Sequence, residues 1–323
     1  HYIGKFYIAD ISIPKQLLNS PDFKVNLTTE NFVGSKLPAR PGSSNKSSFG
    51  KALLICGSKL YCGAAKIARN ALLRSGAGIS FVMVPDSILS ETQSDNTDAI
   101  TIGLKSSKDG YIKASLENIE SVLEFISINK ITAVGLGMGM TDTEDTSAFV
   151  GELLSKIKVP VCLDADGLHG LKKHKEKILA NRELKLVITP HTGEMASLID
   201  CQPENVLMDR LNISRNFSSE NNCVTLLKGH RTIICDPTGK TYINTSGNPA
   251  MAKGGMGDAL AGLITGFLAL GMTQMDAAVC ACYIHGKAGD LALANVFEYS
   301  MTTGDLIGKI SEAMATVTGR NKK

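Results

Sequence analysis

The residues best suited to chemistry form a glycine-rich turn near the carboxyl end of the sequence, at residues 254–258 (Gly-Gly-Met-Gly-Asp). A helical pattern over about residues 256–270 follows at once. Backbone N–H groups at the start of a helix attract anions, and glycine allows the close approach and unusual φ values that an anion nest needs. Gly255 and Gly257 would donate these amides, and Asp258 could accept a proton from a hydroxyl that attacks a phosphoryl group. The alternative is a tight turn in which the aspartate only caps the helix.

Two widespread nucleotide-binding motifs are missing from the sequence. The pattern GxxxxGK followed by Ser or Thr does not occur, and residues 57–63, which follow the first apolar run, do not contain GxGxxG. The sequence therefore favours neither a P-loop NTPase nor a dinucleotide-binding dehydrogenase.

Eight segments between about residues 50 and 294 resemble, in order, the motifs of the NAD(P)H-hydrate dehydratases, a branch of the ribokinase-like superfamily. They are residues 57–58 with 61–65, 74–78, 135–139, 163–168, 189–194, 227–232, 244–258 and 283–289. Two of them keep the family's glycines but lose another residue: 135–139 lacks the usual proline, and Met256 stands where many members have threonine. Residues 164–169 end in Gly-Leu-His instead of Ala-Leu-Asn, which leaves the role of His169 open.

The resemblance implies an α/β fold, a ribokinase-like three-layer sandwich with a mostly parallel central sheet and helices on both faces. It implies a hydro-lyase that dehydrates the 6S hydrate of NADH or NADPH with ADP or ATP as co-substrate and with Mg²⁺. The ring hydroxyl is phosphorylated, and phosphate, a better leaving group than hydroxide, is then eliminated. Family members commonly form tetramers, so a homo-oligomer is expected. Bacterial members typically use ADP, and the richness in Lys, Asn and Ile points to a bacterial chain, so ADP is the expected donor.

The resemblance also assigns residues to the site. Asp258 would be the catalytic base, and Gly255 and Gly257 would stabilise the developing negative charge. The residues expected at the hydrate are Gly63, Ala64, Ala65, Gly137, His191 and Asp258. The residues expected at the nucleotide are Lys228, Gly229, His230, Arg231, Thr232, Asn248 and Gly257. No residue is assigned as a metal ligand.

Structural alternatives exist for several of these residues. His191 could be an ordinary surface-loop histidine, and residues 228–232 could be a hairpin turn. Asp164 and Asp166 either brace their loop, which is the preferred interpretation, or order Mg²⁺ through water.

Two further residues carry weaker hypotheses. Glu194 is a candidate contact of the metal or the phosphate. His285 lies on an otherwise apolar helix, and we expect a core histidine with its hydrogen bonds satisfied.

Two other functions compete with the dehydratase. One is a small-molecule kinase of the same superfamily, such as a hydroxymethylpyrimidine or hydroxyethylthiazole kinase, which would use the same turn and release a phosphorylated product. The other is a nucleotide-sensing protein without turnover. Asp258 argues against the second, because a pure phosphate binder gains nothing from a carboxylate beside its anion.

Short apolar runs alternate with helical patterns from Gly50 onward, which predicts a parallel sheet covered on both faces. The expected strands are residues 51–56, 79–84, 131–135, 159–163, 185–189 and 223–227, with a hairpin of 232–235 and 240–244. The expected helices are residues 63–75, 113–128, 145–157, 203–217, 256–270 and 274–295. The last two are expected to close the chain, with Thr273 and Asp276 capping the second.

Composition limits the class of protein. The net charge is +3, with 34 Lys and Arg against 31 Asp and Glu, and aromatic residues are 5% without any tryptophan, so we expect no nucleic-acid partner. The eight cysteines form no CxxC pair, which argues against zinc and for a reducing compartment. There is no apolar run of 18 residues and no signal-peptide pattern, so we expect a cytoplasmic protein without a membrane partner.

Residues 1–48 differ from the main domain, which we place at residues 49–323. Residues 6–14 could form a strand that ends at Pro14, and residues 38–48 have the composition of a linker. Residues 9–14 resemble the final strand of the hydrate epimerase domain that precedes the dehydratase in bifunctional members. Since the sequence begins at His1, we expect that it is a portion of a longer protein.

Overall fold

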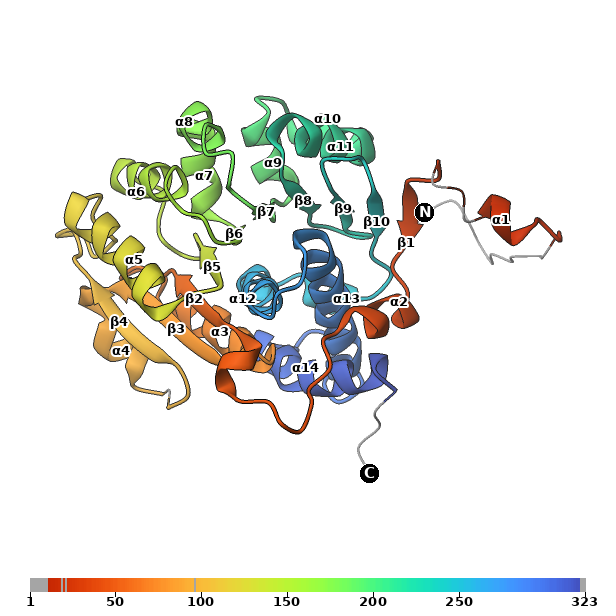
Figure 1. Cartoon of the computed structure of the whole chain (residues 1–323), viewed down its shortest axis with the longest axis horizontal. Helices are drawn as coiled ribbons and strands as arrows, with labels where there is room; N and C mark the ends of the chain where they lie inside the picture. Colours follow the sequence, from red (N-terminus) through yellow and green to blue (C-terminus); the bar gives the residue numbers. More distant parts are fainter. Residues whose placement is uncertain (1–10, 19, 21, 96, 320–323) are drawn as a thin grey trace.

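The computed structural model describes residues 11–18, 20, 22–95 and 97–319 of the chain (Figure 1). One sheet runs through this part, with the strand order β1-β10-β9-β8-β7-β6-β5-β2-β3-β4. The strands are β1 Val25–Leu27, β2 Lys51–Ile55, β3 Ile79–Pro85, β4 Ile100–Leu104, β5 Ala133–Leu136, β6 Val161–Leu163, β7 Leu186–Ile188, β8 Val224–Leu227, β9 Ile233–Cys235 and β10 Thr241–Ile243. All neighbouring pairs are parallel except those of β9, which is antiparallel to both β8 and β10.

The central strands are apolar throughout because both faces of the sheet are covered. Alternate residues of β2 face opposite layers: Ala52 and Leu54 belong to one buried hydrophobic cluster, and Leu53 and Ile55 belong to the other. The expected parallel sheet is therefore confirmed. Strands β1 and β4 were not expected, because these edge strands are short and partly exposed and lack a continuous apolar run.

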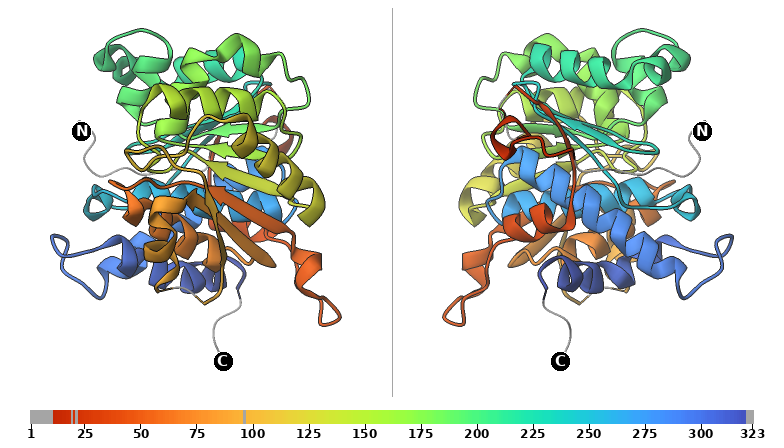
Figure 2. Two further views of the ribbon diagram at one scale, coloured as in Figure 1. Left: turned by 90° about the vertical axis from the view of Figure 1, so that its left-hand side faces the viewer. Right: turned by 90° about the vertical axis from the view of Figure 1, so that its right-hand side faces the viewer.

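Helices form a layer on each face of the sheet, as Figure 2 shows. The layer in the first cluster contains α2 Glu30–Lys36, α3 Cys62–Arg74, α12 Met256–Ala269, α13 Gln274–Leu293 and α14 Thr303–Val317. The layer in the second contains α5 Leu116–Asn129, α6 Glu144–Leu154, α7 Asp166–Lys173, α8 Lys175–Leu179, α9 Thr192–Leu198, α10 Pro203–Met208 and α11 Arg210–Asn221. The short helices α1 Lys15–Leu18 and α4 Leu89–Gln93 complete the set among the described residues. This is the three-layer α/β sandwich that the sequence predicts.

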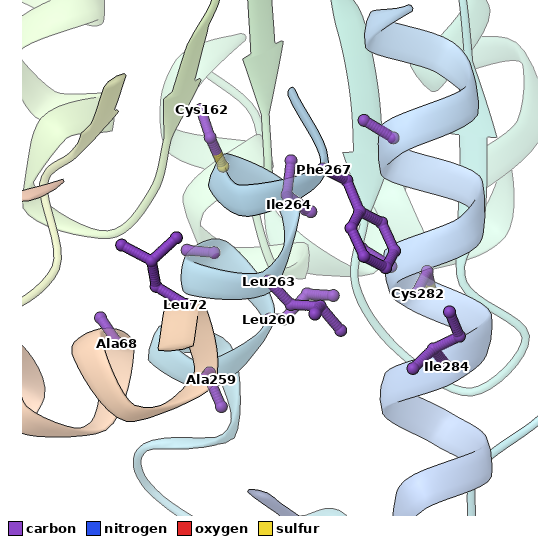
Figure 3. Packing of buried hydrophobic residues seen from close by; sticks show 14 of the residues in the cluster. Ala68, Leu72, Cys162, Ala259, Leu260, Leu263, Ile264, Phe267, Cys282 and Ile284 are labelled. Carbon is purple, nitrogen blue, oxygen red and sulfur yellow. The ribbon is translucent and has the colours of Figure 1, made fainter. Parts of the chain in front are cut away.

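Helix α12 is almost entirely buried and lies between α3 and α13 (Figure 3). Its glycines let α3 approach closely. A Cβ on Gly262 would lie 2.1 Å from the backbone oxygen of Ala68, and one on Gly266 would lie 2.0 Å from Oγ of Ser75. Close packing on both sides fixes α12, and with it the glycine-rich turn at its start.

Three expectations about the helices need correction. The expectation that residues 256–270 and 274–295 close the chain is wrong, because α14 follows them and begins with a capping box between Thr302 and Asp305. The expected helix 203–217 is two helices that break at Asp209, whose side chain caps α11. The expected helix 113–128 begins only at Leu116, after the N-cap Ser115.

The N-terminal part is only partly described. The strand expected over residues 6–14 lies mostly outside the described residues, and residues 11–14 have no regular secondary structure. Strand β1 pairs with β10, and Val33 of α2 is fully buried in the first cluster, so residues 25–36 pack with the main sheet. The division of the chain at residue 48 stays a prediction.

Among the helices described, none is both long and apolar enough to cross a bilayer.

Candidate active site at the start of helix α12

The glycine-rich turn has the geometry of an anion nest. Gly255 is the N-cap of α12 and has φ 87° and ψ −18°, a left-handed conformation that favours glycine. A Cβ at Gly255 would lie 2.7 Å from Cδ1 of Ile67, so the site also lacks room for a side chain. Oγ1 of Thr303 donates a hydrogen bond to the oxygen of Gly254 at 3.2 Å and ties the turn to α14. Gly257 lies within the helix and does not have a positive φ, so Gly255 is the position that needs a left-handed backbone.

Asp258 is the third residue of α12 and is half-buried. Because the N-cap is a glycine, no side chain caps the helix, and within the described part of the chain the Asp258 carboxylate makes no capping hydrogen bond. Burial and, second, the carboxylate of Asp164 raise the pKa of Asp258 to about 7, although the ammonium of Lys228 opposes the shift. A carboxylate that exchanges its proton near neutral pH is suited to general-base catalysis.

Lys228 and Asp164 meet beside this carboxylate, although 64 residues separate them in the sequence. Asp164 follows β6 directly and Lys228 follows β8 directly, and the carboxyl ends of parallel strands meet at one edge of a sheet. Nζ of Lys228 donates to Oδ1 of Asp164 at 2.8 Å, and Oγ1 of Thr189 donates to the same oxygen at 2.7 Å. Glu194 adds a second carboxylate, whose Oε2 lies 3.6 Å from Nζ of Lys228.

The charges around Lys228 favour its protonated form. Burial opposes the charge, but the carboxylates of Asp164, Glu194 and Asp258 outweigh that cost and hold the pKa of Lys228 above its ordinary value. A Cβ on Gly257 would lie 3.4 Å from Nζ of Lys228 and 3.6 Å from Oδ2 of Asp164. The fold therefore brings the glycine-rich turn, the ammonium of Lys228 and the carboxylates of Asp164 and Asp258 into one place.

His191 is the N-cap of α9, and its side chain forms a capping box with Glu194. Nδ1 of His191 accepts from the backbone N–H of Glu194 at 3.1 Å, and Oε2 of Glu194 accepts from the backbone N–H of His191 at 2.6 Å. Since Nδ1 accepts, Nε2 carries the proton of the neutral ring. Nε2 lies 3.4 Å from Oε1 of Glu194, and the His191 side chain is 59% exposed, so a ligand can approach the ring while Nδ1 caps the helix. Contact with the hydrate stays a prediction.

The other residues expected at the hydrate differ in exposure. Gly63 is exposed and Ala64 is half-buried at the start of α3, where a ligand can approach them. Ala65 is fully buried, so its side chain packs in the core. Gly137 is also buried; it has φ 118°, and a Cβ there would lie 2.0 Å from the oxygen of Asp164. Gly137 thus allows the loop after β5 to pack against the loop after β6.

Residues 228–232, which we expect at the nucleotide, form the turn of a hairpin between the antiparallel strands β8 and β9. This is the structural alternative that the sequence left open for them. Gly229 has φ 143° and Arg231 has φ 56°, and Oγ1 of Thr232 donates to the oxygen of Gly229 at 2.9 Å. Nη1 of Arg231 donates to the oxygen of Thr245 at 3.0 Å and links the hairpin to the segment that leads into the glycine-rich turn. The backbone oxygen of His230 accepts from Nη1 of Arg210 at 2.7 Å.

Asn248 holds the other end of that segment. Its Nδ2 donates to Oδ1 of Asp290 at 2.9 Å, and its Oδ1 accepts from the backbone N–H of Ala250 at 3.1 Å. Oδ2 of Asp290 accepts from the backbone N–H of Gly247 at 3.0 Å. Asn248 therefore braces the approach to the turn, and its contact with a nucleotide stays a prediction.

Two supporting residues were missed from the sequence, Arg210 and Asp290. Arg210 holds two carbonyls of the hairpin, those of His230 and Leu227, from 17 or more residues away. Asp290 lies near the end of α13, 42 residues after its partner Asn248. Hydrogen bonds at such separations leave no short-range pattern in the sequence.

Asp166 braces the loop after β5, as preferred from the sequence. Its Oδ2 accepts from the backbone N–H of Thr141 at 2.9 Å, and Thr141 has φ 71°. A positive φ in a β-branched residue is an outlier and costs on the order of 1–3 kcal/mol. Burial raises the pKa of Asp166, against the hydrogen bond from Thr141. Nδ1 of His169 lies 2.7 Å from Oδ2 of Asp142, but no hydrogen bond is aligned between them.

His285 is buried, as expected, and burial lowers its pKa to about 4, against a hydrogen bond with the backbone of Met256. The expectation that its hydrogen bonds are satisfied is wrong for Nε2, which is buried and has no hydrogen-bond partner among the described residues. The eight cysteines are all free thiols, six of them buried. Within residues 11–319 as described, no three His, Cys, Asp or Glu side chains are grouped to hold a metal ion.

A cavity of about 490 Å³ opens at the opposite edge of the sheet, where β6, β7 and β8 begin. Its lining includes Lys158, Lys185 and Asn222, and none of the residues expected at the site from the sequence. We place the site by its chemistry, because the base, the cation and the anion nest all lie at the carboxyl edge.

Comparisons with known proteins identify the family of the chain. The profile of the NAD(P)H-hydrate dehydratase family matches residues 52–312. The chain is 35% identical over 304 residues to a bifunctional NAD(P)H-hydrate repair enzyme of Moorella thermoacetica, a match that covers 94% of this chain and 56% of the relative. It is 32% identical to the enzyme of the same name from Thermofilum pendens, over 96% of this chain and 58% of the relative. The chain thus spans little more than half the length of these relatives.

Solved structures give the same fold. The ADP/ATP-dependent NAD(P)H-hydrate dehydratase of Bacillus subtilis, co-crystallised with ATP and Mg²⁺, matches with a TM-score of 0.74 and 25% identity over 90% of this chain and 98% of that one. A hydroxyethylthiazole kinase of Pyrococcus horikoshii matches with a TM-score of 0.55 and 16% identity over 83% of this chain and 89% of that one, which shows a shared fold alone.

Proposed function

Because this chain belongs to the NAD(P)H-hydrate dehydratase family, we propose that it dehydrates the 6S hydrate of NADH or NADPH with ADP or ATP as the phosphoryl donor. The observation that carries the proposal is the position of Asp258. It follows the anion nest in the first turn of α12, and its pKa is raised to about 7 by burial and by the neighbouring Asp164 carboxylate.

In the proposed reaction, Asp258 accepts the proton of the ring hydroxyl while the hydroxyl oxygen attacks the terminal phosphoryl group. The amides of Gly255 and Gly257 and the ammonium of Lys228 stabilise the charge that develops on the phosphoryl oxygens. The C–O bond of the phosphorylated hydrate then breaks as the ring-nitrogen lone pair forms a C=N bond. Loss of a proton from the adjacent ring carbon restores the dihydronicotinamide. The products are NADH or NADPH, inorganic phosphate and the nucleotide one phosphate shorter.

The carboxylates fit a role for Mg²⁺. Asp164 and Asp166 each engage one oxygen in bracing, and within the described part of the chain no protein donor contacts Oδ2 of Asp164 or Oδ1 of Asp166. Magnesium often keeps several waters and binds through one or two carboxylates and the substrate phosphates. We propose that these two residues hold Mg²⁺ through water. When bound, the ion neutralises charge on the nucleotide phosphates.

The proposal extends to the protein's wider organisation. The matched relatives are named bifunctional, and the chain spans little more than half of their length, which supports a longer protein that also epimerises the hydrate. Large apolar side chains of the N-terminal segment are exposed, which supports contact with a further domain or subunit. These side chains are Ile11, Ile13, Leu17, Leu18, Phe23, Val25 and Leu27. We propose that the protein forms a homotetramer and that it is located in the cytoplasm.

A substrate panel separates the dehydratase from the kinase of the same superfamily. The protein is incubated with the 6S hydrate of NADH, with hydroxymethylpyrimidine and with hydroxyethylthiazole, each with ADP and with ATP. Consumption of the hydrate alone supports the proposal, and faster turnover with ADP supports ADP as the donor. Efficient phosphorylation of either alcohol with the hydrate untouched would refute it.

A further inference from the structure

Four residues from three segments form one hydrogen-bonded chain next to the proposed site. Oγ1 of Thr141 donates to Oγ of Ser58 at 2.8 Å, and the same Ser58 oxygen accepts from the backbone N–H of Tyr61 at 3.3 Å. The backbone N–H of Thr141 donates to Oδ2 of Asp166 at 2.9 Å. These hydrogen bonds thus link the start of α7, the loop after β5 and the loop between β2 and α3.

Thr141 is held in an unfavourable conformation within this chain. Its φ of 71° is rare for a β-branched residue, and such strain persists only where surrounding contacts determine the backbone. Ser58 is almost fully buried, so its oxygen is fixed between its two partners. Strained residues of this kind cluster at binding and catalytic sites.

The last residue of the hydrogen-bonded chain, Tyr61, is an exposed aromatic residue at the start of α3. Tyr61 directly precedes α3, whose first residues include Gly63 and Ala64, and its side chain does not cap that helix. The residue is 48% exposed. Gly139 backs it, because a Cβ there would lie 2.8 Å from Cβ of Tyr61.

We propose that Tyr61 forms one wall of the pyridine-nucleotide subsite and that Thr141 is a positioning residue that fixes Tyr61 through Ser58. This inference rests on the proposed function, since it names the ligand as the dinucleotide hydrate. The hydrogen bond to Ser58 holds the backbone of Tyr61. Its aromatic side chain can therefore stack on the dihydropyridine ring without the cost of ordering the loop.

The test is a double-mutant cycle on the full chain. Tyr61→Ala raises the KM for the hydrate about fivefold to tenfold and leaves the KM for the nucleotide unchanged. Thr141→Ala raises the hydrate KM in the same direction, and Thr141→Ser, which keeps the hydroxyl, restores most of the loss. Because Thr141 acts through Tyr61, the KM of the double variant for the hydrate should be no higher than that of Tyr61→Ala alone. Ile128→Ala, at an exposed apolar residue near the end of α5, is the control.

Binding of NADH, followed by its fluorescence, is measured for every variant because it requires no turnover. An unchanged affinity and hydrate KM in Tyr61→Ala, or additive effects in the double variant, would overturn the inference and leave the dehydratase proposal standing. If the unmodified protein binds NADH but does not consume the hydrate, the proposed function fails, and the NADH affinities of the variants still decide the role of Tyr61.

Discussion

A carbon atom added as the Cβ of Gly257 would lie 3.4 Å from Nζ of Lys228. Gly257 belongs to the first turn of α12, and Lys228 belongs to the loop after β8. A side chain at residue 257 would therefore extend toward the ammonium of Lys228. A single methyl group would fit at this position, whereas a larger side chain would fill the space in front of Lys228.

Gly257→Val is expected to abolish turnover without unfolding the protein. The branched side chain would enter the space between the α12 amides and Lys228, whereas the helical backbone at this position tolerates any residue. Turnover should fall more than about a hundredfold, the usual effect of losing an oxyanion contact. Gly254→Ala is the control, since a Cβ there meets no atom within 4 Å. Normal turnover by the valine variant would contradict the assignment of the phosphate site to this turn.

Asp258→Asn is expected to lower turnover by a factor of about 10² to 10⁴ while nucleotide binding stays near normal. The amide keeps the shape of the carboxylate but cannot take the hydroxyl proton. Asp276→Asn is the matched control, because Asp276 occupies the same third position in α13. Steady-state kinetics and titration calorimetry measure the two effects. If the Asp258 variant retained more than about a third of the activity, the carboxylate would not be the base.

The raised pKa of Asp258 predicts two pH effects. Turnover should rise with pH through about 7 as the carboxylate forms. The unfolded state releases this proton near pH 4 and the folded state near 7, so the folded state binds more protons in that window and loses stability as pH rises. The variant Asp258→Asn lacks this titration. Its free energy of unfolding relative to that of the unmodified protein should therefore increase between pH 4 and 7, by on the order of 2–4 kcal/mol. Above pH 7 this difference should stay constant. Chemical denaturation across this range measures the difference; parallel curves would contradict a raised pKa.

Lys228→Met is expected to weaken nucleotide binding and to raise the pKa of Asp258 further. The ammonium opposes the upward shift at Asp258, so the low-pH limb of the activity profile should move to higher pH in this variant. Lys172→Met is the control, since Lys172 forms an ion pair with the exposed Asp200. If the pH profile of activity and the nucleotide affinity were both unchanged in Lys228→Met, Lys228 would have no role in the site.

The sequence predicted the core of the site because its chemistry is encoded locally. Glycines directly before a helix mark the nest, and Asp258 and Lys228 lie within short motifs. Strands β2, β3 and β5 to β8 were found because burial on both faces makes them continuous apolar runs. Which glycine needs a left-handed backbone could not be told from spacing, because it depends on where α12 begins.

What the sequence missed depends on contacts between distant segments. Arg210 and Asp290 brace loops across 17 or more residues, and Thr141 contacts Ser58 across 83. Helix α14 was missed although Thr302 and Asp305 form a readable capping box. Edge strand β4 was missed because its pattern is only partly apolar and partly buried.

The most direct test of the proposed function is the stoichiometry of its products. The purified chain is incubated with the 6S hydrate of NADH and with ADP or ATP, and NADH absorbance and inorganic phosphate are followed together. We predict equimolar NADH and phosphate, both dependent on the nucleotide and both lost in Asp258→Asn. A phosphorylated product without NADH, or NADH formed without nucleotide consumption, would contradict a dehydratase that phosphorylates its substrate and then eliminates phosphate.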